Sequence, residues 1–310
     1  MTWAPDPDAF VRDLEAKPAA LRALAPLLES DPWCGLDTPV RIVCIGMGSS
    51  RFAALPIGGM LRALGRDVVI ERASATDATP AAPGTLAVGI SASGSTPETV
   101  AALTRHRDGG STTIAITEAE GSALGAVADR HIALHAGEET GGVACRTFQH
   151  TIAVLLALVD APRASAAVRR AADATEDLLD RRSTWLPAAV DELGTASVFV
   201  IAPEERISSA EQSSLMFREG PRLQADACET GDWLHVDVYL TKPLDYRALL
   251  FTGSGFDADV RRWIDERSGR LVSIGAGGIR YRGDEDPDVA LLTETLVSEL
   301  VAADVWRRQA

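Results

Sequence analysis

The chain has 310 residues and a formal net charge of −14, and 46% of its residues are hydrophobic. This length and composition are typical of a globular protein with room for two domains. Such an acidic chain repels nucleic acid and anionic membranes, so neither is expected as a partner. The apolar stretch 151–159 is too short for a membrane span and the acidic N-terminus does not resemble a signal peptide, so we expect a cytoplasmic protein.

Strand and helix patterns alternate through both halves of the chain. A helical pattern over 8–28 precedes β-branched runs at 40–46, 85–91, 112–117 and 130–135. A helical segment over 164–182 follows, and then come predicted strands at 196–202, 247–253, 270–275 and 288–292 and a helix from about Thr293. This alternation predicts an α/β fold with two doubly wound parallel sheets. We expect a first domain over 1–160, a helical linker over 161–187 and a second domain over 188–310.

Two turns rich in glycine and hydroxyl groups follow predicted strands in the first half. They read Gly-Met-Gly-Ser-Ser at 46–50 and Ser-Ala-Ser-Gly-Ser-Thr at 91–96. Small residues let the backbone approach a ligand, and a helix N-terminus adds free N–H groups and a positive dipole. Together the turns predict a cradle for a phosphorylated small molecule, although each alone could be a tight strand-to-helix connection. The candidate binding residues are Gly48, Ser49, Ser50, Ser91, Ser93, Ser95 and Thr96.

The second half supplies candidate acid–base chemistry at 210–220 and 224–235. Moving a proton between C1 and C2 of an open-chain sugar needs a carboxylate that takes and returns it. Opening the sugar ring needs a second acid–base group near the ring oxygen. Glu219 and His235 suit these two roles. Taken alone, Glu219 could instead be a solvated carboxylate on a helix face, and His235 could be a structural histidine.

These motifs, with Glu-Glu-Thr-Gly-Gly-Val-Ala-Cys-Arg-Thr-Phe at 138–148, resemble the signature series of sugar isomerase (SIS) domains. The layout is similar to the isomerase half of glucosamine-6-phosphate synthase and to fructosamine-phosphate deglycases. The resemblance implies two flavodoxin-like SIS domains in tandem. It also implies that Glu219 is the isomerising carboxylate and His235 the ring-opening histidine, sixteen residues apart as in the family. By the same resemblance, the phosphate is held by Ser50, Ser91, Ser93 and Thr96, and the sugar is lined by Val143 and Ala144.

Several positions depart from the pattern of the family's synthases. Met216 stands where they have a lysine, and the C-terminal segment lacks their Schiff-base lysine. The chain contains only Lys17 and Lys242, so Lys242 is the candidate for an imine. Because no glutaminase segment precedes the first motif, we do not expect synthesis of glucosamine 6-phosphate.

We therefore predict an isomerase or deglycase that acts on a ketose, aldose or amino-sugar phosphate. The rival hypothesis is a non-catalytic sugar-phosphate sensor, which the missing lysines favour. Glu139 is a further candidate site residue because it precedes 141–143, and its alternative role is that of a loop carboxylate. We expect no cofactor and no metal, because no His, Cys and carboxylate cluster has ligand spacing. The expected partners are a phosphorylated sugar and a second copy of the chain in a homodimer, in which one subunit's histidine enters the other's site.

Overall fold

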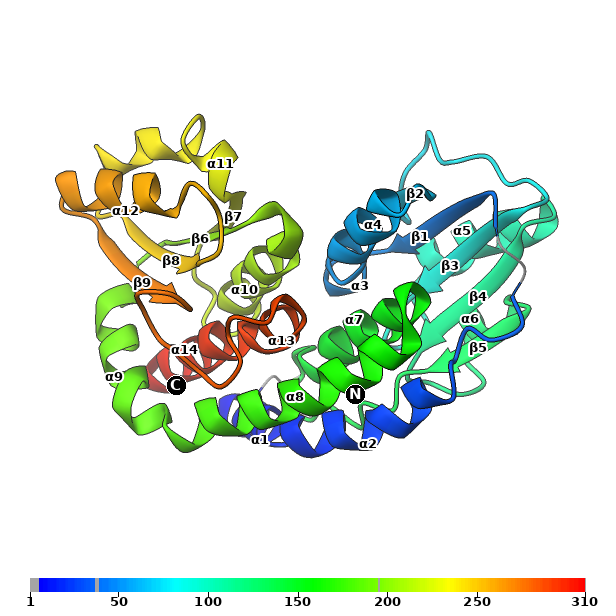
Figure 1. The fold of residues 1–310 in the computed structure, drawn as a ribbon, viewed down its shortest axis with the longest axis horizontal. Helices are drawn as coiled ribbons and strands as arrows, with labels where there is room; N and C mark the ends of the chain where they lie inside the picture. Colours follow the sequence, from blue (N-terminus) through cyan, green and yellow to red (C-terminus); the bar gives the residue numbers. More distant parts are fainter. Residues whose placement is uncertain (1–5, 37–38, 195, 310) are drawn as a thin grey trace. The chain divides into compact units, whose positions relative to one another are not determined.

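The computed structural model describes residues 6–36, 39–194 and 196–309. It confirms an α/β protein with two parallel sheets, as predicted. The chain divides into two compact units, one around each sheet (Figure 1). The first-sheet unit contains Arg22–Glu138 and Arg146–Ala166. The second-sheet unit contains the segment up to Leu21, the loop Glu139–Cys145 and the chain from Ala167 onward, so it is not continuous in sequence.

The first sheet has the strand order β2-β1-β3-β4-β5, and all its pairings are parallel. Its strands are β1 (Arg41–Gly46), β2 (Asp67–Arg72), β3 (Thr85–Ile90), β4 (Thr112–Thr117) and β5 (Arg130–Ala133). The helices of this unit are α3 (Ser49–Phe52), α4 (Ala54–Ala63), α5 (Pro97–Asp108), α6 (Ala123–Ala126) and α7 (Arg146–Val159). Two helices cross the unit boundaries along the chain, namely α2 (Lys17–Glu29) and α8 (Ala161–Asp180).

Side chains of β1 alternate between two buried faces, as expected of a strand covered by helices on both sides. Val43 and Ile45 join a core cluster with Leu103 of α5 and Leu124 of α6. The intervening Ile42 is also buried, at 3% exposure, so the opposite face is covered as well. Figure 1 shows helices on both faces of this sheet.

The second sheet has the order β7-β6-β8-β9 and is also parallel throughout. Its strands are β6 (Val198–Ala202), β7 (Ala225–Glu229), β8 (Arg247–Phe251) and β9 (Arg270–Ile274). The helices of this unit are α1 (Pro7–Glu15), α9 (Arg182–Leu193), α10 (Ile207–Glu219), α11 (Thr230–Trp233), α12 (Asp257–Glu266), α13 (Pro287–Thr293) and α14 (Thr295–Gln309). Two short 3-10 helices complete it, η1 (Glu204–Arg206) and η2 (Asp237–Thr241).

Alternation along β6 also separates two cores in the second-sheet unit. Val198 and Val200 pack in one cluster with residues of α9, α10 and α14. Phe199 and Ile201 pack in the other, where Phe199 stacks on Tyr246 with ring centroids 4.3 Å apart. Each face of the sheet therefore has its own hydrophobic layer.

The predicted strand at 288–292 is wrong, because this run lies in helix α13. Asp286 caps the helix by accepting hydrogen bonds from the N–H groups of Asp288 and Val289, and Pro287 occupies the first turn. Val289–Leu292 are all buried, so the continuous apolar run reflects a helix surrounded by protein. Strands β2 and β7 were not predicted, because charged residues interrupt their apolar patterns.

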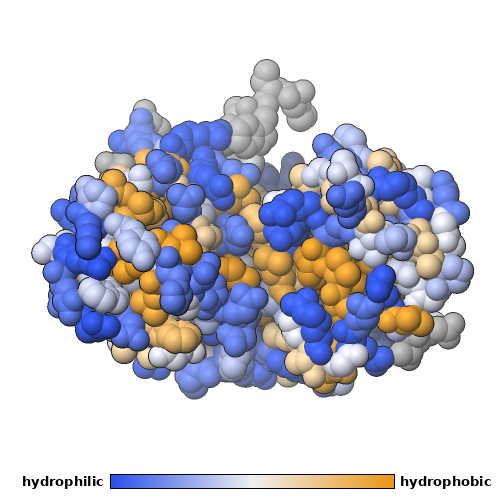
Figure 2. All heavy atoms as spheres, turned by 90° about the horizontal axis from the view of Figure 1, so that it is seen from above, coloured by the Kyte–Doolittle hydropathy of each residue, from blue (hydrophilic) through white to orange (hydrophobic). Residues whose placement is uncertain are grey.

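The described chain contains no helix that is long and apolar enough to cross a membrane. Figure 2 shows a surface in which hydrophilic side chains are interspersed with smaller hydrophobic areas.

Candidate functional site

The two hydroxyl-rich turns lie at neighbouring strand ends of the first sheet. β1 pairs with β3, and Ile45 is opposite Gly89 in the register, so both strands end at the same edge. The chain moves from β1 outward to β2 and then returns to β3 on the other side of β1. Ligands of open α/β sheets bind at the carboxyl ends of strands where the strand order reverses in this way.

The first turn is shaped by two glycines. Gly48 has φ 49° and ψ −130° and immediately precedes α3, so a side chain there would be strained. A Cβ on Gly46 would lie 3.1 Å from the backbone N of Arg51, tighter than ordinary packing allows. Ser49 and Ser50 are half-buried at the start of α3. The turn therefore brings backbone and hydroxyl groups to the sheet edge.

The second turn is held together by its own hydroxyl groups. Ser91 and Thr96 share a hydrogen bond of 2.9 Å between their side-chain oxygens, and Ser95 Oγ donates to Ser93 Oγ at 2.9 Å. Gly94 has φ 62°, and a Cβ there would overlap the side chain of Ser122. Ser93 and Ser95 are exposed, so their hydroxyls are accessible to a ligand.

The second turn also begins a helix of three turns. Thr96 is the N-cap residue of α5, and its side chain makes no capping hydrogen bond. The turn thus combines hydroxyls with free helical N–H groups, which favours an anion. Hydrogen bonds in this turn pair Ser91 with Thr96 and Ser95 with Ser93 at the start of α5.

The loop 139–145 belongs to the second-sheet unit, although it follows the first sheet in sequence. The backbone N–H of Gly141 donates to Asp13 Oδ2 at 2.7 Å, and a Cβ on Gly141 would overlap the backbone of Phe10. The N–H of Cys145 donates to Glu139 Oε1 at 2.6 Å. The side chain of Glu139 therefore accepts a hydrogen bond from the backbone of its own loop. This contact fits the role of a loop carboxylate, which is the alternative to a catalytic role.

A buried ion pair is close to this loop. Lys17 Nζ bonds Glu299 Oε2, and their side chains are 1% and 0% exposed. Burial raises the pKa of the Cys145 thiol well above its usual value, with Glu139 raising it further. Cys145 is therefore a protonated core residue rather than a reactive thiolate.

Gln212 links the loop to the helix that carries Glu219. Its Nε2 donates to the carbonyl oxygen of Ala144 at 2.9 Å. Gln212 lies on α10 seven residues before Glu219, so the two residues share approximately one face of the helix. Val143 packs its side chain in the core at 1% exposure, which leaves only its backbone to line a ligand. Sequence reasoning missed Gln212, although its spacing from Glu219 was a usable signal.

Glu219 is the last residue of α10 and is half-buried. Burial raises the pKa of its carboxyl group, while Arg222 and Arg218 act in the opposite direction. Gly220 follows directly and packs against the ring of Trp306, where a Cβ would lie 3.1 Å from the nearest ring carbon. A carboxylate whose pKa is shifted toward neutrality is a competent proton acceptor and donor.

His235 lies just after α11 in the same unit as Glu219. Its backbone N–H donates to the carbonyl of Asp232 at 2.8 Å, and its side chain is exposed. The preceding helix is capped by Glu229, which accepts from the N–H of Asp232 at 2.8 Å. The histidine is thus presented at the surface by a short capped helix.

Met216 and the two lysines of the chain have different environments. Met216 is fully buried in the core, and Gln212 Nε2 contacts its sulfur at 3.7 Å. Lys17 is buried in an ion pair with Glu299, whereas Lys242 is exposed at the end of η2. Of the two lysines, Lys242 is the one accessible to a ligand.

Comparisons with known proteins agree with this description. Residues 36–161 match the SIS domain family. The C-terminal domain of glucosamine-fructose-6-phosphate aminotransferase from Francisella tularensis has a TM-score of 0.83 to this chain at 15% identity, over 96% of both chains. Tagatose-6-phosphate ketose/aldose isomerase from Escherichia coli gives 0.79 at 18% identity, over 100% of this chain and 96% of its own.

Glucosamine-6-phosphate deaminase from Thermotoga maritima gives a TM-score of 0.74 at 20% identity, over 97% of this chain and 95% of its own. No curated protein matches the chain. At these identities the likeness establishes the fold, which this chain shares with all three structures.

Proposed function

We propose that this protein binds a phosphorylated ketose, aldose or amino sugar and catalyses isomerisation or deglycation by proton transfer between C1 and C2. The observation that carries the proposal is the pair of turns at 46–50 and 91–96, which follow the neighbouring strands β1 and β3 where the strand order of the first sheet reverses. The SIS match over residues 36–161 covers both turns. In this proposal Ser50, Ser91, Ser93 and Thr96 hold the phosphate.

Glu219 serves as the base that removes a proton from one carbon and returns it to the next. Its raised pKa supports this role, because a carboxylate with a pKa nearer neutrality is a stronger base and takes a proton from carbon more readily. His235 serves as the acid that protonates the ring oxygen before the proton transfer, and its exposed side chain is free to reach a ligand. The backbone of Val143 and Ala144, tied to α10 by Gln212, lines the sugar.

We also propose that the protein works as a homodimer. Large apolar side chains are exposed close to His235 in sequence, at 52% for Val236 and 68% for Tyr239. Exposed apolar side chains near a functional residue are typical of an interface. Light scattering that shows a fully active monomer would exclude this assembly.

The decisive experiment begins with a thermal-shift screen of sugar phosphates. Each ligand that stabilises the protein is then incubated with it in D₂O, and deuterium at C1 and C2 is followed by NMR. We expect exchange with the native protein and with Glu211→Gln, a control on the same helix, but not with Glu219→Gln. Binding without exchange by the native protein would instead establish a sugar-phosphate sensor.

His235→Ala separates ring opening from proton transfer. We expect this variant to lose activity on cyclic substrates and to retain it on analogues that cannot close a ring. If both Glu219→Gln and His235→Ala keep native turnover, the chemistry lies elsewhere, and Glu139 and Lys242 are the next residues to replace.

A further inference from the structure

The outer edge of the second sheet has an open place beside β9. β9 is the last strand in the order β7-β6-β8-β9, whereas the first sheet places β5 beside β4 at the equivalent position. In the part of the chain that the structure describes, a single bridge between Ile274 and Ile279 lies on this side of β9. Residues 271–273 are therefore left at an open edge.

Hydrogen bonds at the two ends of β9 show which backbone groups point outward. Arg270 N–H donates inward to the carbonyl of Tyr246 at 2.8 Å, and the carbonyl of Ser273 accepts outward from Ile279 N–H at 2.8 Å. Because successive residues alternate, both backbone groups of Leu271 and the N–H of Ser273 also point outward. One residue of an added parallel strand could therefore donate to Leu271 and accept from Ser273.

A groove of about 650 Å³ follows this edge. Its volume lies within the usual range of ligand sites, roughly 300–1,000 Å³. One wall is a single face of α9, in which Thr184 and Ala188 are small and exposed and Glu192, one turn further on, contributes a carboxylate. The opposite side is formed by Arg261 of α12 and by the loop 277–280 after β9. The edge of β9 is thus accessible at the bottom of a groove rather than on a flat surface.

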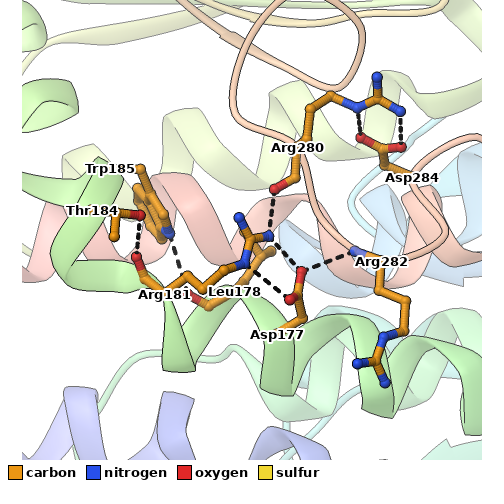
Figure 3. Close-up of polar contacts among 8 residues, drawn as sticks. All are labelled: Asp177, Leu178, Arg181, Thr184, Trp185, Arg280, Arg282 and Asp284. Carbon is orange, nitrogen blue, oxygen red and sulfur yellow. Dashed lines mark hydrogen bonds and ion pairs between the residues drawn. The ribbon is translucent and has the colours of Figure 1, made fainter.

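Two arginines that line the groove, Arg181 and Arg280, are each paired with a carboxylate (Figure 3). Arg181 Nε and Nη2 donate to Asp177 at 2.9 and 2.5 Å, and Nη2 also donates to the carbonyl of Arg280 at 2.7 Å. Arg280 itself pairs with Asp284, whose side chain is 2% exposed against 58% for the arginine. The guanidinium groups are therefore held in place while their remaining N–H groups face solvent.

Arg261 provides a positive charge on the other side of the groove. Its Nη2 donates to the carbonyl of Ala276 at 2.8 Å, and no carboxylate contacts it among the residues that the structure describes. Val272 packs in the core on the α9 side and Leu271 in the core on the α12 side. In an added strand, the residue opposite Val272 would face α9, and its two neighbours would face α12 and Arg261.

We propose that this groove binds an extended acidic peptide of a partner protein by strand addition to β9. The peptide would place a small apolar residue toward α9 and a carboxylate toward Arg261, with backbone hydrogen bonds to Leu271 and Ser273. A second copy of this chain is a poorer occupant, because pairing of two β9 edges would bring arginines against arginines. The proposal is independent of the sugar-phosphate reaction.

The test uses two acetylated, amidated pentapeptides, Thr-Glu-Val-Glu-Thr and Thr-Lys-Val-Lys-Thr, each with a fluorescent label for anisotropy titration. We expect the full-length protein to bind the acidic peptide and not the basic one, with weaker binding as salt is added. Arg261→Glu should weaken binding by about tenfold or more, because it replaces an attraction by a repulsion. Ala188→Glu should weaken it as well, since it adds a second carboxylate, one turn from Glu192, to the wall of the groove.

The matched control is Arg262→Glu on the same helix. Arg262 pairs with Asp259 at 2.7 Å and does not line the groove, so its replacement should leave peptide affinity unchanged. The proposal is overturned if the acidic peptide does not bind, if both peptides bind equally, or if the Arg261 and Arg262 variants lose affinity to the same extent. It is also overturned if Ala188→Glu alone changes the sedimentation coefficient, because a second copy would then cover the edge.

Discussion

Replacing Lys17 by methionine should destabilise the second-sheet unit strongly, because it leaves the charge of Glu299 buried without its partner. The Lys17 and Glu299 side chains are 1% and 0% exposed. Glu299 Oε1 already has no hydrogen-bond partner among the described residues, so Oε2 depends on Lys17. Removal of one member of a buried ion pair costs about 3–5 kcal/mol of unfolding free energy.

The pH dependence of this loss follows from the pKa of Glu299. Burial raises that pKa and Lys17 lowers it, so the Lys17→Met variant should have a still higher folded-state pKa. A carboxyl group with a raised folded-state pKa disfavours folding once it ionises, so the loss should be small below the unfolded-state pKa of about 4.3. The loss should grow as the pH rises from there through the folded-state pKa.

The assay is urea unfolding of the native protein and its variants at pH 5 and pH 8, followed by tryptophan fluorescence. The other lysine provides the matched control, because Lys242 is exposed and Lys242→Met should change the free energy of unfolding by no more than about 0.5 kcal/mol. Adding Glu299→Leu to Lys17→Met should restore much of the lost stability, since no buried charge then remains. Equal midpoints for Lys17→Met and Lys242→Met at pH 8 would refute the reasoning.

Three further predictions concern the candidate site. Alanine at both Ser93 and Thr96 should weaken the binding of sugar phosphates in calorimetric titrations. The unfolding midpoint should fall only slightly, because Ser93 is exposed and Thr96→Ala removes one side-chain hydrogen bond, that to Ser91. Unchanged affinity would contradict the cradle. Glu219→Gln should be more stable than the native protein at pH 8 and equally stable at pH 4. Burial raises the pKa of Glu219, so ionisation of its carboxyl group opposes folding in the native protein. A stability difference between the two proteins that does not change with pH would contradict this explanation. Gly141→Ala should lower the free energy of unfolding by about 1–3 kcal/mol, since its methyl group would overlap the backbone of Phe10, and native stability in urea would show that the loop can move aside.

The sequence alone determined the fold class and the position of the two hydroxyl-rich turns at the ends of β1 and β3. β-branched runs such as 85–90 form strands because their side chains are buried on both faces, and that pattern is visible without coordinates. The turns were equally visible because glycine and hydroxyl residues follow those runs directly. The assignment of Glu219 and His235 rested on the family's spacing and stays a prediction, as does the division into domains at 1–160 and 188–310.

Only the tertiary structure decided which apolar runs are strands and which are helices. The apolar run at 288–292 is compatible with a buried strand and with a buried helix. The cap at Asp286 and the burial of the run on all sides make it helical. Tertiary structure also decided that the loop 139–145 packs with α1 and α10, through Asp13 and Gln212, which are distant from the loop in sequence. Contacts of this kind leave no local pattern, because each depends on a partner more than sixty residues away.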